Sequence, residues 1–318
     1  MQIGKFCRHA LTSWVVGALL AACAGAQRLV WEPAATLQAH VGHNGSRMLA
    51  DAKESNLLYV SDGKDGVRIF TYPGGKPAGT LDLAGPGAEC SDRYGNVYIA
   101  NGSLYEFAHG GTTPMAIFPV SRSDQIEGCS VDPSTGDVAI SVYETAQRAY
   151  YIAIFASGNP GIQNDITDNE LSQYYSLAYD GSSDLFVVGS RYYTFTLTEL
   201  AHGASAFRDV QISGHASGSF VEWDGQYLAV WDRYVLYQLR ISGGTATVVG
   251  SVTLNGNPGM AQPWLARNTF VAPILVEHEK KRGIAIWPYP AGGKPLSRIL
   301  QFARGVPPTA MTVSVAPH

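Results

Sequence analysis

The chain is poor in charge, has no basic excess and contains little that would cross a membrane. Its 318 residues are 15% charged, with 22 Lys and Arg against 26 Asp and Glu, giving a formal net charge of −4. A nucleic-acid-binding surface needs a basic excess on one face, so we expect no nucleic-acid partner. The apolar stretch at residues 11–22 has 12 residues, too few for a membrane-spanning helix.

Familiar catalytic motifs are missing as well. The sequence has no Gly-x-Ser-x-Gly elbow, no Gly-rich phosphate loop ending in Lys-Ser/Thr and no His-Glu-x-x-His pair. These absences lower the expectation of an enzyme. They do not exclude one, because an active site assembled from residues scattered along the chain leaves no local motif.

Short β-rich runs recur along most of the chain. They consist of Val, Ile, Leu and aromatic residues, most follow a turn residue, and their starts lie 40, 41, 47, 42 and 43 residues apart. The six runs are residues 56–62, 96–101, 137–142, 184–189, 226–231 and 269–274. A period of this size marks a repeat architecture, and several runs follow an Asp-containing turn.

Each run is followed by a second apolar strand and then by a Gly-containing turn. The first and last of these turns are nearly identical, Tyr-Pro-Gly-Gly-Lys-Pro at 72–77 and Tyr-Pro-Ala-Gly-Gly-Lys-Pro at 289–295. About four short strands in each unit indicate blades of antiparallel sheet around a central channel. The sequence therefore predicts an all-β, six-bladed β-propeller over residues 45–318, with seven blades and a composite closing blade as the alternative.

The closure of the ring is predicted from the two ends of the repeat region. Residues 48–50 read as the inner strand of the first blade, and residues 309–315 also read as a strand. Residues 29–31 offer a further strand. The two ends of the chain are expected to complete one blade together, which removes a free sheet edge.

The runs Leu57–Asp62 and Asn96–Asn101 carry a resemblance to known repeats. They resemble NHL- and YVTN-type propellers, within the broader group that includes the SMP-30/gluconolactonase fold, over about residues 45–315. The resemblance implies the fold and leaves the function open, because propellers include enzymes, receptors and scaffolds.

The start of the chain has the features of an export signal. Lys5 and Arg8 precede the apolar stretch, which ends in Leu-Ala-Ala before Cys23. This ending resembles the bacterial lipobox, which implies a signal peptide over residues 1–22, lipidation of Cys23 and a tether over residues 23–44. Ordinary cleavage after Ala26 and an uncleaved anchor are the alternatives. Ala rather than Asp at position 24 implies, by family analogy, an outer-membrane lipoprotein; a periplasmic or secreted protein is the alternative.

The cysteines fit an oxidising compartment. After removal of the signal and lipidation of Cys23, only Cys90 and Cys129 remain. They occupy matching places in neighbouring repeats, so both are expected on the innermost strands of adjacent blades. A disulfide, two buried free thiols, and a metal or redox role are the three possibilities.

A ligand-binding face is expected where the connections into the inner strands gather. Aromatic rings, amides and carboxylates there can stack on and hydrogen-bond a sugar or a peptide. The alternative is that the aromatic side chains pack between blades. The candidate residues are His43, Glu127, Tyr174, Tyr175, His215 and Trp264.

Two functions are compatible with these features. The first is non-catalytic binding or scaffolding at the bacterial cell envelope by a monomer that touches the membrane only through its lipid, with a polysaccharide, a peptide or an envelope protein as partner and no cofactor. The alternative is a lactonase-like hydrolase with one divalent ion, Ca²⁺ or Zn²⁺, held by Glu127 and Glu222. Asp92, Asp132, Asp180 and Asp224 share a repeated turn position, which favours a structural role for them.

Overall fold

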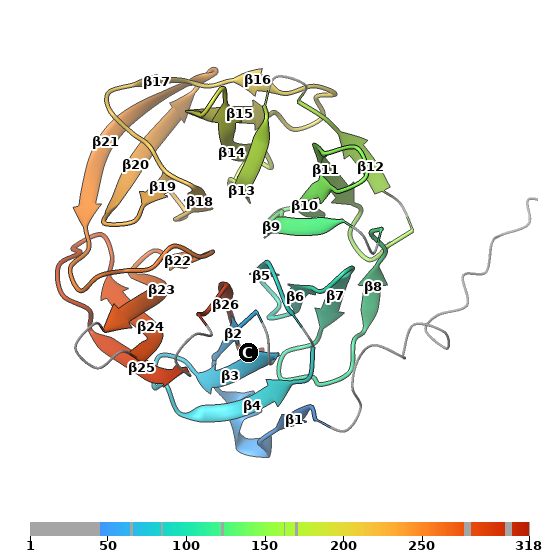
Figure 1. The fold of residues 1–318 in the computed structure, drawn as a ribbon, viewed down its shortest axis with the longest axis vertical. Helices are drawn as coiled ribbons and strands as arrows, with labels where there is room; N and C mark the ends of the chain where they lie inside the picture. Colours follow the sequence, from blue (N-terminus) through green and yellow to red (C-terminus); the bar gives the residue numbers. More distant parts are fainter. Residues whose placement is uncertain are drawn as a thin grey trace, which may run out of the picture. The chain divides into compact units, whose positions relative to one another are not determined.

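The apolar runs form the second strands of six small sheets arranged in a ring (Figure 1). The structure is a computed structural model that describes residues 45–317 except 64–65, 84, 122–123, 162, 169–170, 277–280 and 303–306. All-β architecture with six blades, mostly of four antiparallel strands, is confirmed. The seven-bladed alternative is wrong.

In each of the first three blades, the strands follow one another from an inner strand at the channel to a short strand at the outside, and they are named here in that order. Blade 1 is β26 (Ala310–Ser314), β2 (Leu57–Ser61), β3 (Val67–Thr71), β4 (Pro77–Leu81) and β1 (Arg47–Met48); blade 2 is β5 (Glu89–Ser91), β6 (Val97–Ala100), β7 (Leu104–Phe107) and β8 (Ala116–Phe118); blade 3 is β9 (Gln125–Val131), β10 (Val138–Glu144), β11 (Ala149–Phe155) and β12 (Gln163–Ile166).

The remaining three blades follow the same order, apart from an added outer strand, β17, in blade 5. Blade 4 is β13 (Gln173–Tyr179), β14 (Leu185–Arg191), β15 (Thr194–Leu200) and β16 (Arg208–Asp209); blade 5 is β18 (Phe220–Trp223), β19 (Leu228–Asp232), β20 (Val235–Ser242), β21 (Thr245–Thr253) and β17 (Gln211–Ser213); blade 6 is β22 (Trp264–Ala266), β23 (Thr269–Val276), β24 (Lys281–Pro288) and β25 (Ser297–Phe302).

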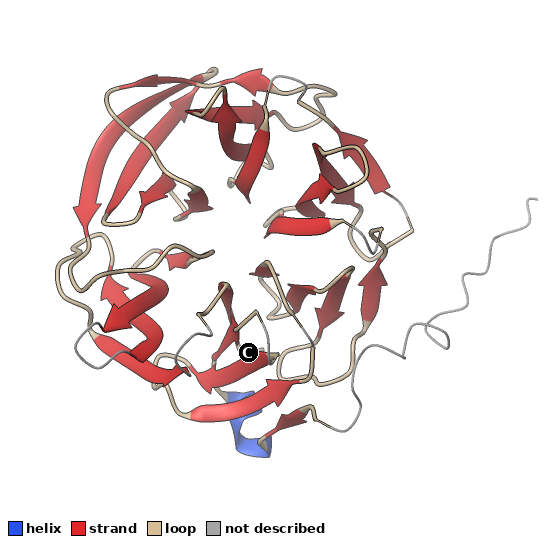
Figure 2. Ribbon diagram, viewed as in Figure 1, coloured by secondary structure: helices blue, strands red, loops and turns tan. Residues whose placement is uncertain are grey.

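Strands dominate the described part of the chain, in which the short 3-10 helix η2 (Ala50–Glu54) is the one helical element (Figure 2). Burial decreases from the second strand outward, because the inner parts of each blade are covered on both faces by their neighbours. All five residues of β2 and all four of β6 are buried, whereas both residues of β16 are exposed. Val, Ile and aromatic side chains suit such two-sided burial. No helix among the described residues is long and apolar enough to span a membrane.

The two ends of the described chain meet in blade 1. The C-terminal strand β26 pairs antiparallel with β2, from Leu57 opposite Ser314 to Ser61 opposite Ala310. This confirms that the ends complete one blade and remove an open edge from the ring. The expected inner strand at residues 48–50 is wrong, because β26 fills that position and Met48 pairs with Gly79 of β4 on the outer side. Residues 29–31 lie outside the described residues.

The nearly identical turns at the two ends of the repeat are the same structure. Each joins the third and fourth strands of its blade, and the Tyr–Pro peptide bond is cis in both. In each turn a glycine adopts a left-handed backbone, with φ of 67° at Gly75 and 65° at Gly292. A Cβ atom at Gly292 would lie 2.5 Å from the carbonyl oxygen of Thr253, so only glycine fits there.

Candidate binding site in the central channel

The six inner strands surround two cavities in the centre of the ring. The loop-side cavity, of about 260 Å³, is lined by residues that lie at or just before the starts of inner strands, such as Gly87, Tyr175 and Thr309. The turn-side cavity, of about 190 Å³, is lined by residues from all six inner strands and reaches Pro133 in the turn after β9. Gln262 lines both cavities, so the two adjoin along the channel.

Glu89 on β5 is a buried acid in the wall of the turn-side cavity. Its side chain is 1% exposed, and the hydroxyl of Ser61 donates a hydrogen bond to Oε1. No described residue donates a hydrogen bond to Oε2. Burial disfavours the charged carboxylate and raises the pKa of Glu89 to about 8, against the hydrogen bond from Ser61, which lowers it. Glu89 is therefore largely protonated at neutral pH while the channel holds no compensating charge.

Gln262 fixes the backbone of Glu89 from the other side of blade 1. The amide nitrogen of Glu89 donates to Oε1 of Gln262 over 3.1 Å, and Nε2 of Gln262 donates to the carbonyl oxygen of Glu89 over 2.7 Å. The Gln262 side chain thus takes the place of a strand partner for Glu89. Because both partners are buried, this pair positions the acid firmly.

Glu222 on β18 supplies a second acid to the same cavity. Its accessible surface is partial and faces the narrow cavity, so water solvates the carboxylate poorly. Burial raises the pKa of Glu222 to about 8, and no charge or hydrogen bond from the described residues offsets that effect. The contacts between neighbouring inner strands place blades 2 and 5, which carry Glu89 and Glu222, three places apart in the ring of six, on opposite walls of the channel (Figure 1).

Aromatic side chains complete the turn-side cavity. Trp223, Trp264 and Tyr179 line it, and both tryptophans keep part of their surface accessible. Trp264 is held at its outer edge by Tyr72, whose ring lies 5.4 Å away at an interplanar angle of 75°. Two tryptophans, a tyrosine and two glutamates therefore belong to the lining of one cavity.

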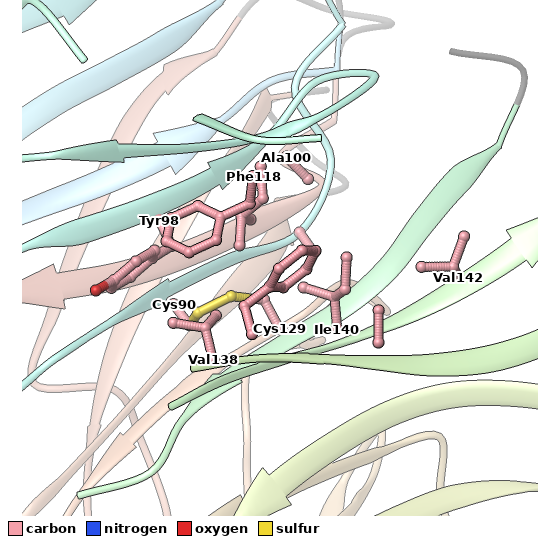
Figure 3. Close-up of a cluster of buried hydrophobic side chains, with 12 residues drawn as sticks. Cys90, Tyr98, Ala100, Phe118, Cys129, Val138, Ile140 and Val142 are labelled. Atoms are coloured by element: carbon pink, nitrogen blue, oxygen red, sulfur yellow. A yellow bond between two sulfur atoms is a disulfide. The ribbon is translucent and has the colours of Figure 1, made fainter. Parts of the chain in front are cut away.

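A disulfide between Cys90 and Cys129 joins the inner strands of blades 2 and 3 (Figure 3). The two Cα atoms lie 5.5 Å apart, and both residues belong to a buried apolar cluster that includes Phe118 and Phe155. The predicted placement on adjacent inner strands is confirmed. Two free thiols and a metal role for these cysteines are wrong.

Hydrogen bonds between inner strands hold the rest of the channel wall. The Ser91 hydroxyl donates to the carbonyl oxygen of Val313 over 2.9 Å, which joins blades 2 and 1. The backbone amide of Tyr179 donates to the hydroxyl of Ser130 over 3.0 Å, which joins blades 4 and 3. The wall is thereby fixed before any ligand arrives, which lowers the entropic cost of binding.

The repeated aspartates are part of the turns between the first and second strands. Asp92 accepts bonds of 2.8 Å from the backbone amides of Tyr94 and Asn96, and Asp180 accepts bonds from those of Ser182 and Asp184. Asp132 and Asp224 accept equivalent bonds from their own turns. The structural role favoured by the repeat pattern is confirmed for all four.

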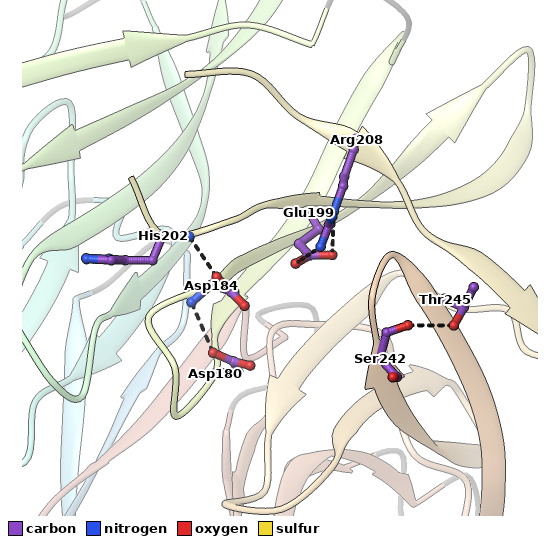
Figure 4. A network of polar contacts seen from close by, with 7 residues as sticks. All are labelled: Asp180, Asp184, Glu199, His202, Arg208, Ser242 and Thr245. Atoms are coloured by element: carbon purple, nitrogen blue, oxygen red, sulfur yellow. Dashed lines mark hydrogen bonds and ion pairs between the residues drawn. The ribbon is translucent and has the colours of Figure 1, made fainter. Parts of the chain in front are cut away.

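In blade 4 this turn is tied to the next one (Figure 4). Oδ1 of Asp184 accepts a 2.7 Å hydrogen bond from the backbone amide of His202, which belongs to the turn after β15. Beside it, Arg208 binds the buried Glu199 with two bonds, of 2.8 and 3.1 Å. Arg208 and Glu199 belong to the two outer strands, β16 and β15, and none of the residues in these contacts lines either channel cavity.

The residues expected on the ligand face fall in different places. Glu127 and Tyr175 line the loop-side cavity, and Trp264 and Glu222 line the turn-side cavity. Tyr174 is buried, with its hydroxyl bonded to the backbone of Asp168. His215 lines neither cavity; it is exposed and packs edge-on against Tyr237. His43 lies outside the described residues.

The donor atoms needed for a metal ion are not gathered in one place in the described part of the chain. No group of three or more His, Cys, Asp or Glu residues there is placed to hold a metal. Glu127 and Glu222, the pair considered for a divalent ion, line different cavities. A calcium or zinc site normally draws on more protein ligands than one carboxylate.

Comparison with solved structures supports the fold. No family model matches the chain, and no curated protein matches its sequence. A protein of unknown function from Bacteroides caccae superposes with a TM-score of 0.60 at 11% identity, over 82% of this chain and 99% of that one. A chain of the nidogen–laminin complex superposes with a TM-score of 0.60 at 10% sequence identity, over 83% of this chain and 99% of that one. TolB from Acinetobacter baumannii superposes with a TM-score of 0.53 at 10% sequence identity, over 82% of this chain and 66% of that one.

At these identities the similarity shows a shared propeller fold and no more. The six-bladed architecture resembles those of the nidogen and TolB structures. The NHL or YVTN type of the repeat stays a prediction, because no family model assigns it. A fold of this kind serves many functions, so the residues of the channel are what bear on the function of this chain.

Proposed function

We propose that the protein is a non-catalytic binding protein of the bacterial cell envelope and that it receives a segment of a polypeptide partner in its central channel. The observation that carries the proposal is the pair of adjoining cavities, whose linings contain glutamate and tryptophan residues on a rigid wall. Concave, largely preformed sites with a few fixed polar groups are typical of binding sites.

A narrow channel suits an extended segment or a side chain better than a broad surface. Gln262 lines both cavities, so a segment bound in one cavity lies against a residue that also bounds the other. One structurally similar chain was solved in the complex of nidogen with laminin, a protein partner. This supports binding as a use of the architecture.

The envelope location rests on the sequence. The lipobox-like ending before Cys23 and the Cys90–Cys129 disulfide both suit an exported protein. Lipidation of Cys23 would hold the propeller at the membrane surface, with the outer membrane as the location implied by Ala24. The hydrolase alternative gains no support from the described residues, because Glu127 and Glu222 line different cavities.

Site-specific crosslinking tests the proposal. A photoreactive benzoylphenylalanine replaces Tyr175 in the loop-side cavity, and Val249 on the outer strand β21, which is 38% exposed, serves as the control position. Both variants are expressed in the producing bacterium and irradiated in intact cells. We expect a discrete crosslinked protein from position 175 and none from position 249. Equal crosslinking at both positions, or none at position 175, would overturn channel binding.

A further inference from the structure

The turn-side cavity has acids on opposite walls and no basic residue to pair with them. Glu89 and Glu222 come from blades 2 and 5, and none of the described residues that line the cavity is Lys, Arg or His. Oε2 of Glu89 is buried without a hydrogen-bond partner among the described residues. When Glu89 is ionised, this oxygen is a buried acceptor without a donor, which costs free energy, and a ligand that brings a donor would remove that cost.

We propose that this cavity binds the guanidinium group of an arginine side chain supplied by the partner. The proposal rests on the proposed function, since it names the part of the partner that the channel receives. Glu89 and Glu222 accept the guanidinium N–H groups from the two sides, and Trp223 and Trp264 supply the flat surfaces on which the planar group stacks.

The shape of the site favours a guanidinium over other cations. A guanidinium is planar and presents five N–H donors in a fixed arrangement, so it can reach carboxylates on two walls at once. It is also less strongly hydrated than an ammonium and stacks on aromatic faces. A metal ion would need more converging donors than this cavity provides, because no group of three His, Cys, Asp or Glu forms among the described residues.

The turn-side end of the channel is acidic. The turns between the first and second strands of blades 2 to 5, together with residues 266–269 of blade 6, contain six carboxylates and two arginines. Of these arginines, Arg93 is already engaged with the carbonyl oxygen of Pro133 and the ring of Tyr94. An acidic rim attracts a cationic segment and speeds its association.

The raised pKa values of Glu89 and Glu222 agree with an unfilled cation site. Burial without a counter-charge holds both pKa values near 8. A cation between the carboxyl groups favours their ionised forms and lowers both pKa values. Binding at neutral pH is then expected to release protons.

The test uses residues 24–318, which omit the signal peptide and Cys23, and N-acetyl-arginine amide as the probe. Quenching of tryptophan fluorescence and ligand-observed NMR report binding, with N-acetyl-citrulline amide and N-acetyl-lysine amide as matched probes. We expect the arginine probe to bind at least tenfold more tightly than either analogue. The variant Glu222→Gln should lose at least tenfold in affinity, and Trp264→Leu should lose part of it. Glu144→Gln, at the end of β10 and outside both cavities, is the matched control.

The outcomes separate this inference from the proposed function. Equal binding of the lysine and arginine probes overturns guanidinium recognition, as does unchanged affinity in a folded Glu222→Gln variant. If no probe binds but Tyr175 still crosslinks a partner, the guanidinium site is refuted and channel binding stands. The arginine probe should also suppress the crosslink at Tyr175. Binding without suppression would assign the site to a free small molecule and overturn the assignment to the partner's side chain.

Discussion

The hydroxyl of Tyr289 donates a 2.6 Å hydrogen bond to Oδ2 of Asp224 and so ties blade 6 to blade 5. Nε2 of Gln238, also in blade 5, donates to the same hydroxyl over 2.9 Å. Tyr72 occupies the matching position in blade 1, and its hydroxyl lies 2.6 Å from the hydroxyl of Thr269 in blade 6. The repeated turn therefore gives each of these blades a tyrosine that reaches back to the preceding blade.

Removing this hydroxyl is expected to destabilise the ring. Tyr289→Phe leaves a buried carboxylate oxygen and an amide without their partner, which should lower the free energy of unfolding by about 1–3 kcal/mol. Urea denaturation followed by fluorescence measures the change. Tyr193→Phe is the control, because Tyr193 is 98% exposed. Equal midpoints for the two variants would show that the bond contributes nothing.

The disulfide is expected to contribute substantially to stability. Cys90 and Cys129 are 39 residues apart, and closing a loop of that length restricts the unfolded chain by about 4 kcal/mol in the chain-entropy model. The double variant Cys90→Ala/Cys129→Ala should lose about that much. Mass spectrometry of the alkylated wild-type chain should show both cysteines blocked until a reductant is added. Labelling before reduction would contradict the bridge.

The buried acid Glu89 makes stability depend on pH. Its pKa is about 8 in the folded protein, raised from an ordinary value of 4.5. The stability linked to its protonated form is fully present below pH 4.5 and is lost as the pH rises through about 8. Glu89→Gln cannot ionise, so it should match the wild type in stability near pH 4 and exceed it at pH 9 by up to about 5 kcal/mol. Glu54→Gln, at an exposed site, is the control.

A chain without its last strand is expected not to close. Deleting residues 309–318 removes β26 and leaves the buried residues of β2 at an open sheet edge. We expect aggregation on expression and loss of the cooperative thermal transition. Deleting only residues 317–318, which lie beyond the strand, should leave the solubility on expression and the cooperative thermal transition unchanged.

Lipidation can be tested directly at Cys23. Growth with a labelled fatty acid should label the wild-type protein, and Cys23→Ser should abolish the label. N-terminal sequencing of the unlabelled protein from the variant then shows whether cleavage has moved to follow Ala26. Labelling of the variant at another residue would contradict the lipobox prediction.

The repeat can be predicted from the sequence because most strands of a blade pair with strands that are close to them along the chain. Each run such as Leu57–Ser61 joins its hairpin partner a few residues later, so apolar character and turn chemistry mark them together. The placement of Met48 is not readable in the same way. Only the long-range pairing of β26 with β2 decides that the inner position of blade 1 is taken.

The site is readable only in part. Glu127, Glu222 and Trp264 attract attention as single polar or aromatic residues beside inner strands. The sequence analysis does not predict Glu89 as a site residue, although a single acid next to Cys90 in an otherwise apolar stretch is a usable signal. Its importance comes from Gln262, which lies 173 positions later and fixes its backbone. No periodicity in the sequence records a contact of that kind.

The way the chain enters and leaves blade 1 also determines how the domain responds to mechanical tension. The entering segment is held by the two-residue strand β1 on the outer side of β4, whereas the ring is closed by β26 from the opposite end of the chain. A pull on the residues ahead of Arg47 would peel β1 from β4 one pair at a time. The load reaches the five pairs between β26 and β2 only after β1 has separated, so the segment ahead of the ring yields before the ring opens.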